Sequence, residues 1–149
     1  MRSNRSVLDL LNRDEWTLVK GDTDERYYLF RFRTPLPEPE MTGDFLHLLR
    51  CIWEYAPESS GEMPSPEVTE DLQLFENRLC EAWELGSVAV LAAVLTFDGV
   101  RQWIFYTCNA KECVRLLNEM PQNKESYPIQ LDTREDPNWS YVREQIIAW

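Results

Sequence analysis

Hydrophobic residues along the chain follow two periods, and these periods alternate from one segment to the next. Alternating or continuous apolar runs predict β-strands at residues 16–20, 26–33, 45–55, 87–97, 101–107 and 127–133. In the second run Tyr28, Phe30 and Phe32 share one side, which predicts an inward-facing surface. The run at 87–97 alternates little and is typical of a central strand covered by other elements.

The clearest helix begins at Ser65-Pro66-Glu67. A serine N-cap, a proline in the first helical position and an early carboxylate are consistent start signals. An apolar stripe at helical spacing follows and is formed by Val68, Leu72, Phe75, Leu79 and Trp83. Gly86 then predicts the end of this helix.

Three further joints carry local signals. Asp98-Gly99 predicts a type I′ hairpin turn between two strands. Asn109, with Glu112 three residues later, predicts a capping box at a second helix. Asp136-Pro137 predicts the start of a last helix, whose apolar stripe is Trp139, Val142, Ile146 and Trp149.

The order of the predicted elements indicates the fold. From Phe45 onward it is β-α-β-β-α-β and then a helix, which is the ferredoxin-like order with two helices on one face of an antiparallel sheet. Residues 1–14 are a frayed or helical lead-in, and residues 15–34 are an added β-hairpin that extends the sheet or covers an edge. We therefore expect a single α+β domain over residues 1–149, with the ferredoxin-like unit at 45–149. A chain of 149 residues, 44% of them hydrophobic, can bury its own core without a metal or disulfides.

The formal net charge of −11 is concentrated in the middle of the chain. Residues 34–86 carry twelve carboxylates against Arg50 and Arg78, a net charge of −10. Such a field repels nucleic acid, so we expect no direct DNA or RNA binding. It favours a basic protein partner or a merely solvated surface. No apolar run approaches the roughly 20 residues that span a bilayer, and no signal-peptide pattern follows the basic N-terminus, so we expect a cytoplasmic protein without membrane contact.

Few residues of the chain offer reactive chemistry. The cysteines form no CxxC pair and are expected to be reduced and mostly buried: Cys51, Cys80, Cys108 and Cys113. His47 is the one histidine of the sequence, so no zinc-ligand set is present and we expect neither metal nor cofactor. We expect His47 to be a partly exposed strand residue.

Enzymatic alternatives rest on a few positions. Cys108, near the start of a helix, would be a nucleophile if the helix N-terminus lowered its pKa. His47 would be a general base. Paired-carboxylate hydrolysis would draw on the acidic cluster Asp132, Glu135 and Asp136, although Asp136 is most simply a helix cap.

The aromatic residues and turns of the chain resemble a known family. The block Gly99–Thr107, the Tyr127-Pro128 pair and the segment Asp136–Tyr141 are similar to the C-terminal signature of the domain of unknown function 695 family. Nearer the N-terminus, similar features are Trp16, the Gly61/Pro64 turn and the Glu76-x-x-Leu79 step. The resemblance runs from about residue 14 to residue 148. One departure is the absence of a tyrosine-proline pair before the strand at Phe45.

The resemblance implies no reaction, because the family is named for lacking a known activity. Some members look fused to a domain similar to regulator of ribonuclease activity B, a ribonuclease E inhibitor that is itself small, acidic and ferredoxin-like. The resemblance also singles out Trp103, Tyr106, Trp139 and Tyr141. These aromatics either pack in the core or form an exposed patch on an open sheet face.

The acidic middle third and the lack of catalytic groups together indicate a function. We expect a non-enzymatic protein-binding module of inhibitor or immunity type that docks on a partner with a basic surface. Its expected binding residues are Glu67, Glu70, Asp71, Glu81, Trp103, Tyr106 and Trp139. The alternative is a small enzyme or ligand-binding domain that uses carboxylates, His47 or Cys108.

Overall fold

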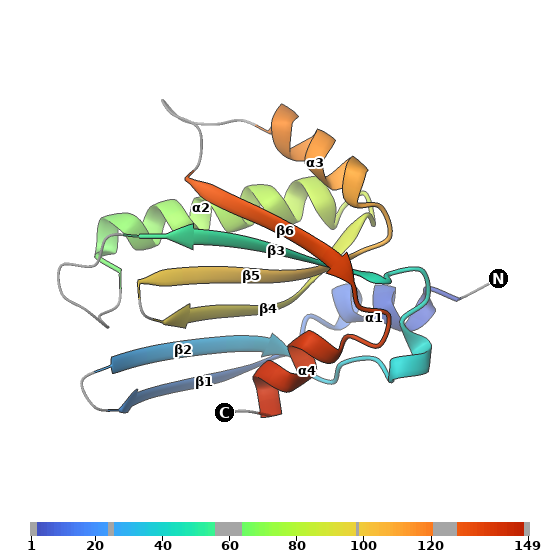
Figure 1. Cartoon of the computed structure of the whole chain (residues 1–149), viewed down its shortest axis with the longest axis horizontal. Helices are drawn as coiled ribbons and strands as arrows, with labels where there is room; N and C mark the ends of the chain where they lie inside the picture. The colour runs from blue at the N-terminus through green and yellow to red at the C-terminus, as the bar shows by residue number, and fades with distance from the viewer. Residues whose placement is uncertain (1–2, 24–25, 56–63, 98, 121–127, 148–149) are drawn as a thin grey trace.

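The structure, a computed structural model, describes residues 3–23, 26–55, 64–97, 99–120 and 128–147. Within these ranges a six-stranded antiparallel sheet has the order β1-β2-β4-β5-β3-β6 (Figure 1). The strands are β1 (Trp16–Thr23), β2 (Arg26–Arg33), β3 (His47–Glu54), β4 (Ala89–Phe97), β5 (Val100–Thr107) and β6 (Ile129–Glu135). The helices are α1 (Arg5–Arg13), α2 (Pro66–Trp83), α3 (Ala110–Glu119) and α4 (Ser140–Ile147), with a short 3-10 turn at Pro39–Met41. The prediction of an α+β chain is therefore confirmed.

The ferredoxin-like topology expected for residues 45–149 is not confirmed. The strand order of the whole sheet differs from that four-stranded arrangement, because the N-terminal hairpin is an integral part of the sheet. Strand β2 pairs with β4 from Tyr28 opposite Phe97 to Phe32 opposite Ala93. The hairpin therefore extends the sheet, and β1 and β6 are the two edge strands of the sheet.

Helices α2 and α3 cover one face of the sheet. The buried side chains of α2 pack against β3, β4 and β5, and they are Leu72, Phe75, Leu79 and Trp83. The rings of Trp83 and Phe105 meet edge to face, with their centroids 4.7 Å apart. Cys113 adds a buried residue from α3 to the same cluster. The apolar stripe predicted for α2 thus forms most of this core.

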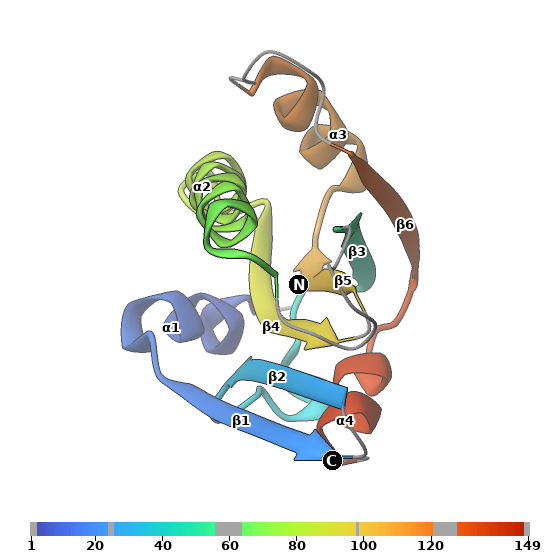
Figure 2. The same ribbon diagram turned by 90° about the vertical axis from the view of Figure 1, so that its left-hand side faces the viewer.

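The opposite face of the sheet is also buried, which differs from the expectation of helices on one face. Val7 and Leu10 of α1, Trp139 just before α4, and Val142 of α4 join a second core cluster with residues of β2, β4 and β5. Figure 2 shows α4 on the side of the sheet opposite α2. Because both faces are covered here, every residue of β4 before Phe97 is buried, as the little-alternating run predicted.

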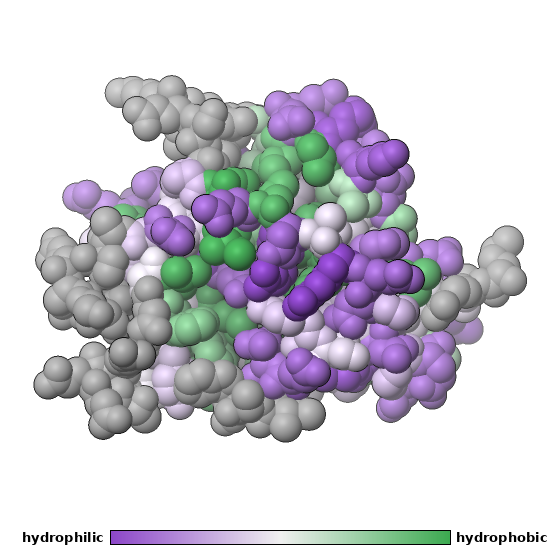
Figure 3. Space-filling view, viewed as in Figure 1, coloured by the Kyte–Doolittle hydropathy of each residue, from purple (hydrophilic) through white to green (hydrophobic). Residues whose placement is uncertain are grey.

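Apolar residues reach the surface on part of the sheet face that α4 covers. Hydrophobic surface gathers over the strands, and hydrophilic surface lies over α4 and the neighbouring segments (Figure 3). Ile52 and Val100 are among the half-buried strand residues. Nothing in the described part of the chain identifies a molecule that would cover this surface.

The first two predicted helix starts are present, one of them in altered form. Ser65 Oγ accepts a hydrogen bond from the Val68 backbone N–H, with Pro66 in the first position. Asn109 Oδ1 accepts from the Glu112 backbone N–H. The carboxylate of Glu112, however, pairs with the guanidinium of Arg115. The second half of the predicted capping box is therefore missing.

Helix α4 starts three residues later than Asp136-Pro137 suggested. The two carboxylate oxygens of Asp136 accept from the backbone N–H groups of Ser140 and Tyr141. Trp139 has a φ of 58°, a left-handed conformation that ends the preceding turn before the helix begins. Asp136 is thus a helix cap, as expected, but of a helix that begins at Ser140.

The hairpin between β4 and β5 closes where the sequence predicts it. Phe97 pairs with Val100, and Gly99 has a φ of 77°, which favours glycine. Asp98 lies outside the described residues, as do Gly61, Tyr127 and Trp149.

Candidate functional site

Four of the predicted binding residues lie on one side of α2. Glu67, Glu70, Asp71 and Glu81 are all exposed, and none of them forms an ion pair with another described residue. At 3.6 residues per turn they project away from the helix side that carries the buried Glu76. Leu74 lies among them and is 38% exposed. We call these five residues, the four carboxylates and Leu74, the carboxylate face of α2.

The three aromatic residues expected to bind are in the core. Trp103, Tyr106 and Trp139 are each 0% exposed. Trp103 packs under α2, whereas Tyr106 and Trp139 stack on the other side of the sheet with ring centroids 4.3 Å apart. They are unable to contact a partner in the folded protein, because helices cover both sheet faces at these positions. Core packing, the other interpretation of these aromatics, therefore applies.

His47 and Cys108 do not form a reactive pair. His47 is exposed at the start of β3, and no hydrogen bond joins it to Cys108 among the described residues. Partial burial raises the pKa of the Cys108 thiol, a backbone hydrogen bond opposes this rise, and the negative charge of Asp44 adds to it. This is the opposite of the lowered pKa that a nucleophile next to a helix N-terminus would have. Burial raises the pKa of Cys113 as well, to about 11.

Two of the three carboxylates in the acidic cluster before α4 make structural contacts. Asp132 accepts from Nε of Arg50 at 2.8 Å, and Arg50 also donates to the Tyr141 hydroxyl at 3.1 Å. Asp136 caps α4 and accepts from the Tyr106 hydroxyl at 2.7 Å. Asp132 and Asp136 are therefore engaged in positioning β3, β5 and α4, whereas Glu135 is exposed.

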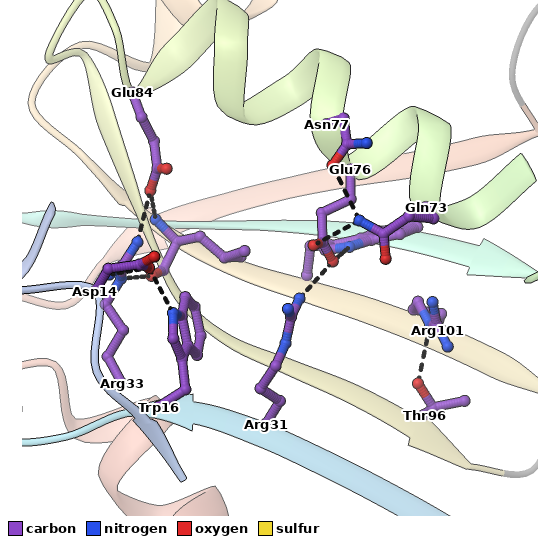
Figure 4. Close-up of polar contacts among 12 residues, drawn as sticks. Asp14, Trp16, Arg31, Arg33, Gln73, Glu76, Asn77, Glu84, Thr96 and Arg101 are labelled. Atoms are coloured by element: carbon purple, nitrogen blue, oxygen red, sulfur yellow. Dashed lines mark hydrogen bonds and ion pairs between the residues drawn. The ribbon is translucent and has the colours of Figure 1, made fainter. Parts of the chain in front are cut away.

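A buried carboxylate lies on the inner side of α2. Glu76 is 6% exposed and accepts a hydrogen bond from Arg31 Nη2 at 2.6 Å and another from Trp103 Nε1 at 2.9 Å, both through Oε1. Gln73 Nε2 lies 3.5 Å from the second oxygen. Figure 4 shows Arg31 reaching from β2 up to α2 to make this ion pair. The contacts join the hairpin, the helix and β5 through a single residue.

Arg33 makes a second buried link beside the first. Its side chain is 4% exposed and donates to the backbone oxygens of Leu91 and Leu10, at 2.6 and 2.8 Å. Glu84 lies 3.2 Å from Nη2. Burial raises the pKa of Glu84, against the opposing effects of the Leu91 N–H and the Arg33 charge. The guanidinium of Arg33 also lies 4.4 Å from the ring centroid of Trp16.

A cavity of about 270 Å³ lies between α2 and the strands next to these links. Thr69, Gln73 and Glu76 of α2 line one side of it. The strands contribute apolar and polar residues, which are Leu18, Leu29, Val94 and Thr96. Arg31 and Arg101 complete the lining, and we call this cavity the arginine pocket.

Arg101 differs from the other two arginines of this region. It is 7% exposed, and its Nε donates to Thr96 Oγ1 at 2.9 Å. Its two terminal nitrogens donate no hydrogen bond to another described residue, and Arg101 forms no ion pair with one (Figure 4). Burial lowers the pKa of Arg101, partly offset by the charge of Glu76. An arginine nevertheless keeps its proton at neutral pH, so a buried positive charge faces the pocket.

These residues were not predicted as a site, although the sequence held a signal for them. Arg31 and Arg33 alternate with Tyr28, Phe30 and Phe32, so the predicted inward face of β2 left the arginines on what looked like the outer face. In the structure that second face lies under α2. Two arginines on a strand with apolar residues on both faces would have indicated buried cations with carboxylate partners.

Residues of the motifs noted above lie close to the arginine pocket. The Arg31 guanidinium lies 4.8 Å from the Trp16 ring centroid and donates to Glu76, which also accepts from Trp103. Trp16, Glu76 and Trp103, which are far apart in sequence, are thus linked through Arg31 and Glu76. No helix in the described ranges is long and apolar enough to cross a membrane.

No curated protein and no solved structure matches the chain. The model of DUF695, a family of unknown function, matches residues 14–145, which is nearly the whole chain. On this match the chain belongs to the DUF695 family.

Proposed function

We propose that this protein is a non-enzymatic binding module of inhibitor or immunity type that docks on a basic protein surface through the carboxylate face of α2. The observation that carries the proposal is the set of four exposed carboxylates on one helix, without ion pairs to other described residues. A basic partner would supply counter-charges to these carboxylates.

Two further features support docking at this face. Leu74 gives the carboxylates an apolar neighbour, and Leu85, just beyond the end of α2, is 80% exposed. Interfaces commonly combine an apolar centre with a charged rim. The helix itself is held firmly from below by Glu76 and by the apolar stripe, so its outer face is presented by a rigid element.

The remaining properties of the chain support a cytosolic, non-catalytic protein. Cys51, Cys80, Cys108 and Cys113 are all free thiols, which suits a reducing compartment. The raised pKa of Cys108 and its lack of a histidine partner among the described residues weigh against a thiol enzyme. The net charge of −11 weighs against direct nucleic-acid binding.

The proposal is tested by reversing the charge of four carboxylates on each of two surfaces, in separate variants of the protein. The first variant carries Glu67→Lys, Glu70→Lys, Asp71→Lys and Glu81→Lys. A matched control carries Glu38→Lys, Glu40→Lys, Glu135→Lys and Glu144→Lys, at exposed positions away from α2. Both variants change the net charge by the same amount. Wild type and both variants are immobilised and exposed to lysate of the native cells, and the retained proteins are identified.

The expected result is a protein that wild type and the control variant retain at low salt and release at high salt. The α2 variant is expected to lose it, with at least a tenfold weaker Kd when that protein is purified and titrated, because several close charge pairs are lost. If the α2 variant retains that protein as well as wild type does, docking at this face is contradicted. If both variants lose it equally, net charge alone explains the binding, which also contradicts docking at this face.

A further inference from the structure

We infer that the arginine pocket binds a small monocarboxylate with an apolar body, and that Arg101 is the residue that recognises its carboxylate. The pocket lies on the inner side of α2, so this inference is independent of docking at the carboxylate face. Each can fail without the other.

The first step of the argument is the state of Arg101. A side chain that is 7% exposed keeps a positive charge in a poorly solvated position, with one hydrogen bond from Nε to Thr96. Arg33, which is 4% exposed, places all its nitrogens against oxygen atoms of Leu10, Leu91 and Glu84. Buried arginines are normally satisfied in this way. Arg101 differs, because its two terminal nitrogens donate to no other described residue and Arg101 lines the pocket.

The second step is the charge balance of the pocket. Arg31 and Arg101 bring two positive charges, and Glu76 brings one negative charge. Glu76 already accepts from Arg31 and Trp103, so its strongest contacts are directed away from Arg101. Among the described residues that line the pocket, one positive charge therefore remains uncompensated, which matches a monoanion. The paired terminal nitrogens of a guanidinium fit the two oxygens of a carboxylate.

The third step is the remainder of the lining. Leu18, Leu29 and Val94 offer apolar contact beside the charged group, and Thr69 and Gln73 offer hydrogen-bonding groups from α2. A volume of about 270 Å³ accommodates a compact ligand rather than a nucleotide or a peptide. A short aliphatic or a single-ring carboxylate meets these conditions.

The experiment uses benzoate and hexanoate as probes, with benzamide and hexanamide as their neutral counterparts and inorganic phosphate as the competing anion class. Chemical-shift changes in the full-length, isotope-labelled protein give the binding site and Kd. We expect saturable shifts at Leu29, Thr96 and Arg101 with a carboxylate, and none with the amides. Arg101→Met is expected to weaken binding at least tenfold, because a charge-assisted bidentate contact is lost.

Folding of the variant is checked at the same time. Arg101→Met removes a poorly solvated charge, so its Tm is expected to equal or exceed that of wild type. Arg5→Met, an exposed arginine on α1, is the matched control and should bind as wild type does. Thr96→Val provides a second test, since it frees Arg101 from its one hydrogen bond and is expected to weaken binding without abolishing it.

Three outcomes would overturn the inference. The first is the absence of saturable shifts at the pocket with either carboxylate. The second is equal binding of the amides or a preference for phosphate. The third is unchanged binding in Arg101→Met.

Discussion

Charged side chains are buried in this protein where several groups hold them at once. Glu76 is held by donors from β2, β5 and its own helix. Arg33 is held by two backbone oxygens and a carboxylate. Burying a charge is unfavourable unless such partners replace the lost water, so each partner contributes to the stability of the others. Arg101 differs, because its two terminal nitrogens donate to no other described residue, and this difference is the basis of the pocket inference.

The Arg31–Glu76 pair should respond asymmetrically to substitution. Arg31→Met leaves the carboxylate of Glu76, whose side chain is 8% exposed, without its cation, and should lower the free energy of unfolding by about 3 kcal/mol at neutral pH. Glu76→Gln should cost only about 1 kcal/mol. The amide can still accept from Trp103, and Arg31, with a 34% exposed side chain, can turn to water. Urea unfolding of the two single variants and the double variant measures both costs and their coupling. Equal costs would contradict this reasoning.

At the scale of secondary-structure elements, α4 is joined to the sheet through the carboxylate that starts it. Asp136 accepts from the backbone N–H groups of Ser140 and Tyr141 and from the hydroxyl of Tyr106 on β5. Burial raises the pKa of Tyr106, so the hydroxyl stays protonated and donates. Trp139 then stacks on the Tyr106 ring and donates its indole N–H to the Phe45 backbone oxygen. One short segment therefore joins α4, β5 and the residues just before β3.

Asp136→Ala should destabilise the protein by about 3 kcal/mol. The loss of a helix cap accounts for about 1 kcal/mol, and the unpaired buried hydroxyl of Tyr106 for the rest. Tyr106→Phe alone should cost about 1 kcal/mol, and the double variant should cost clearly less than the sum of the two. Chemical unfolding followed by tryptophan fluorescence gives these values. Additive costs would show that the Asp136–Tyr106 contact contributes little.

At the scale of the whole molecule, two apolar clusters on opposite faces of one sheet hold together a strongly acidic chain. The sheet is covered on one face by α2 and α3 and on the other by α4, and nearly all residues of β4 and β5 are buried, so these two strands form the centre of the fold. Carboxylates are concentrated in residues 34–86, and those on α2 lie close together. Their mutual repulsion opposes folding, and salt screens it.

Salt should therefore stabilise the protein. Raising the ionic strength from about 0.01 to about 1 M shortens the Debye length from about 30 to about 3 Å, and Tm should rise as repulsion among the carboxylates is screened. The α2 variant with four lysines should show a smaller rise, because its repulsion is already relieved. Calorimetry with a chloride salt makes the comparison. A Tm that falls with salt in wild type would mean that favourable ion pairs outweigh the repulsion.

The sequence by itself determined the local features of this protein. Strand and helix periods follow from which residues must face a core, and caps such as Ser65 and Asn109 act within a few residues of their own helices. The exposure of the four carboxylates on α2 follows in the same way, because they lie off the apolar stripe of that helix. The late start of α4 was missed, since the left-handed Trp139 depends on contacts with distant residues.

Only the tertiary structure decided how the elements combine. The pairing of β2 with β4, and so the strand order, depends on contacts between segments more than sixty residues apart, such as Tyr28 and Phe97. The same pairing places Arg31 beneath α2, where it meets Glu76, and leaves Trp103 and Trp139 in the core rather than on a binding surface. A strand pattern shows which residues share a face, but the face that is buried, and beneath which helix, is set by long-range packing.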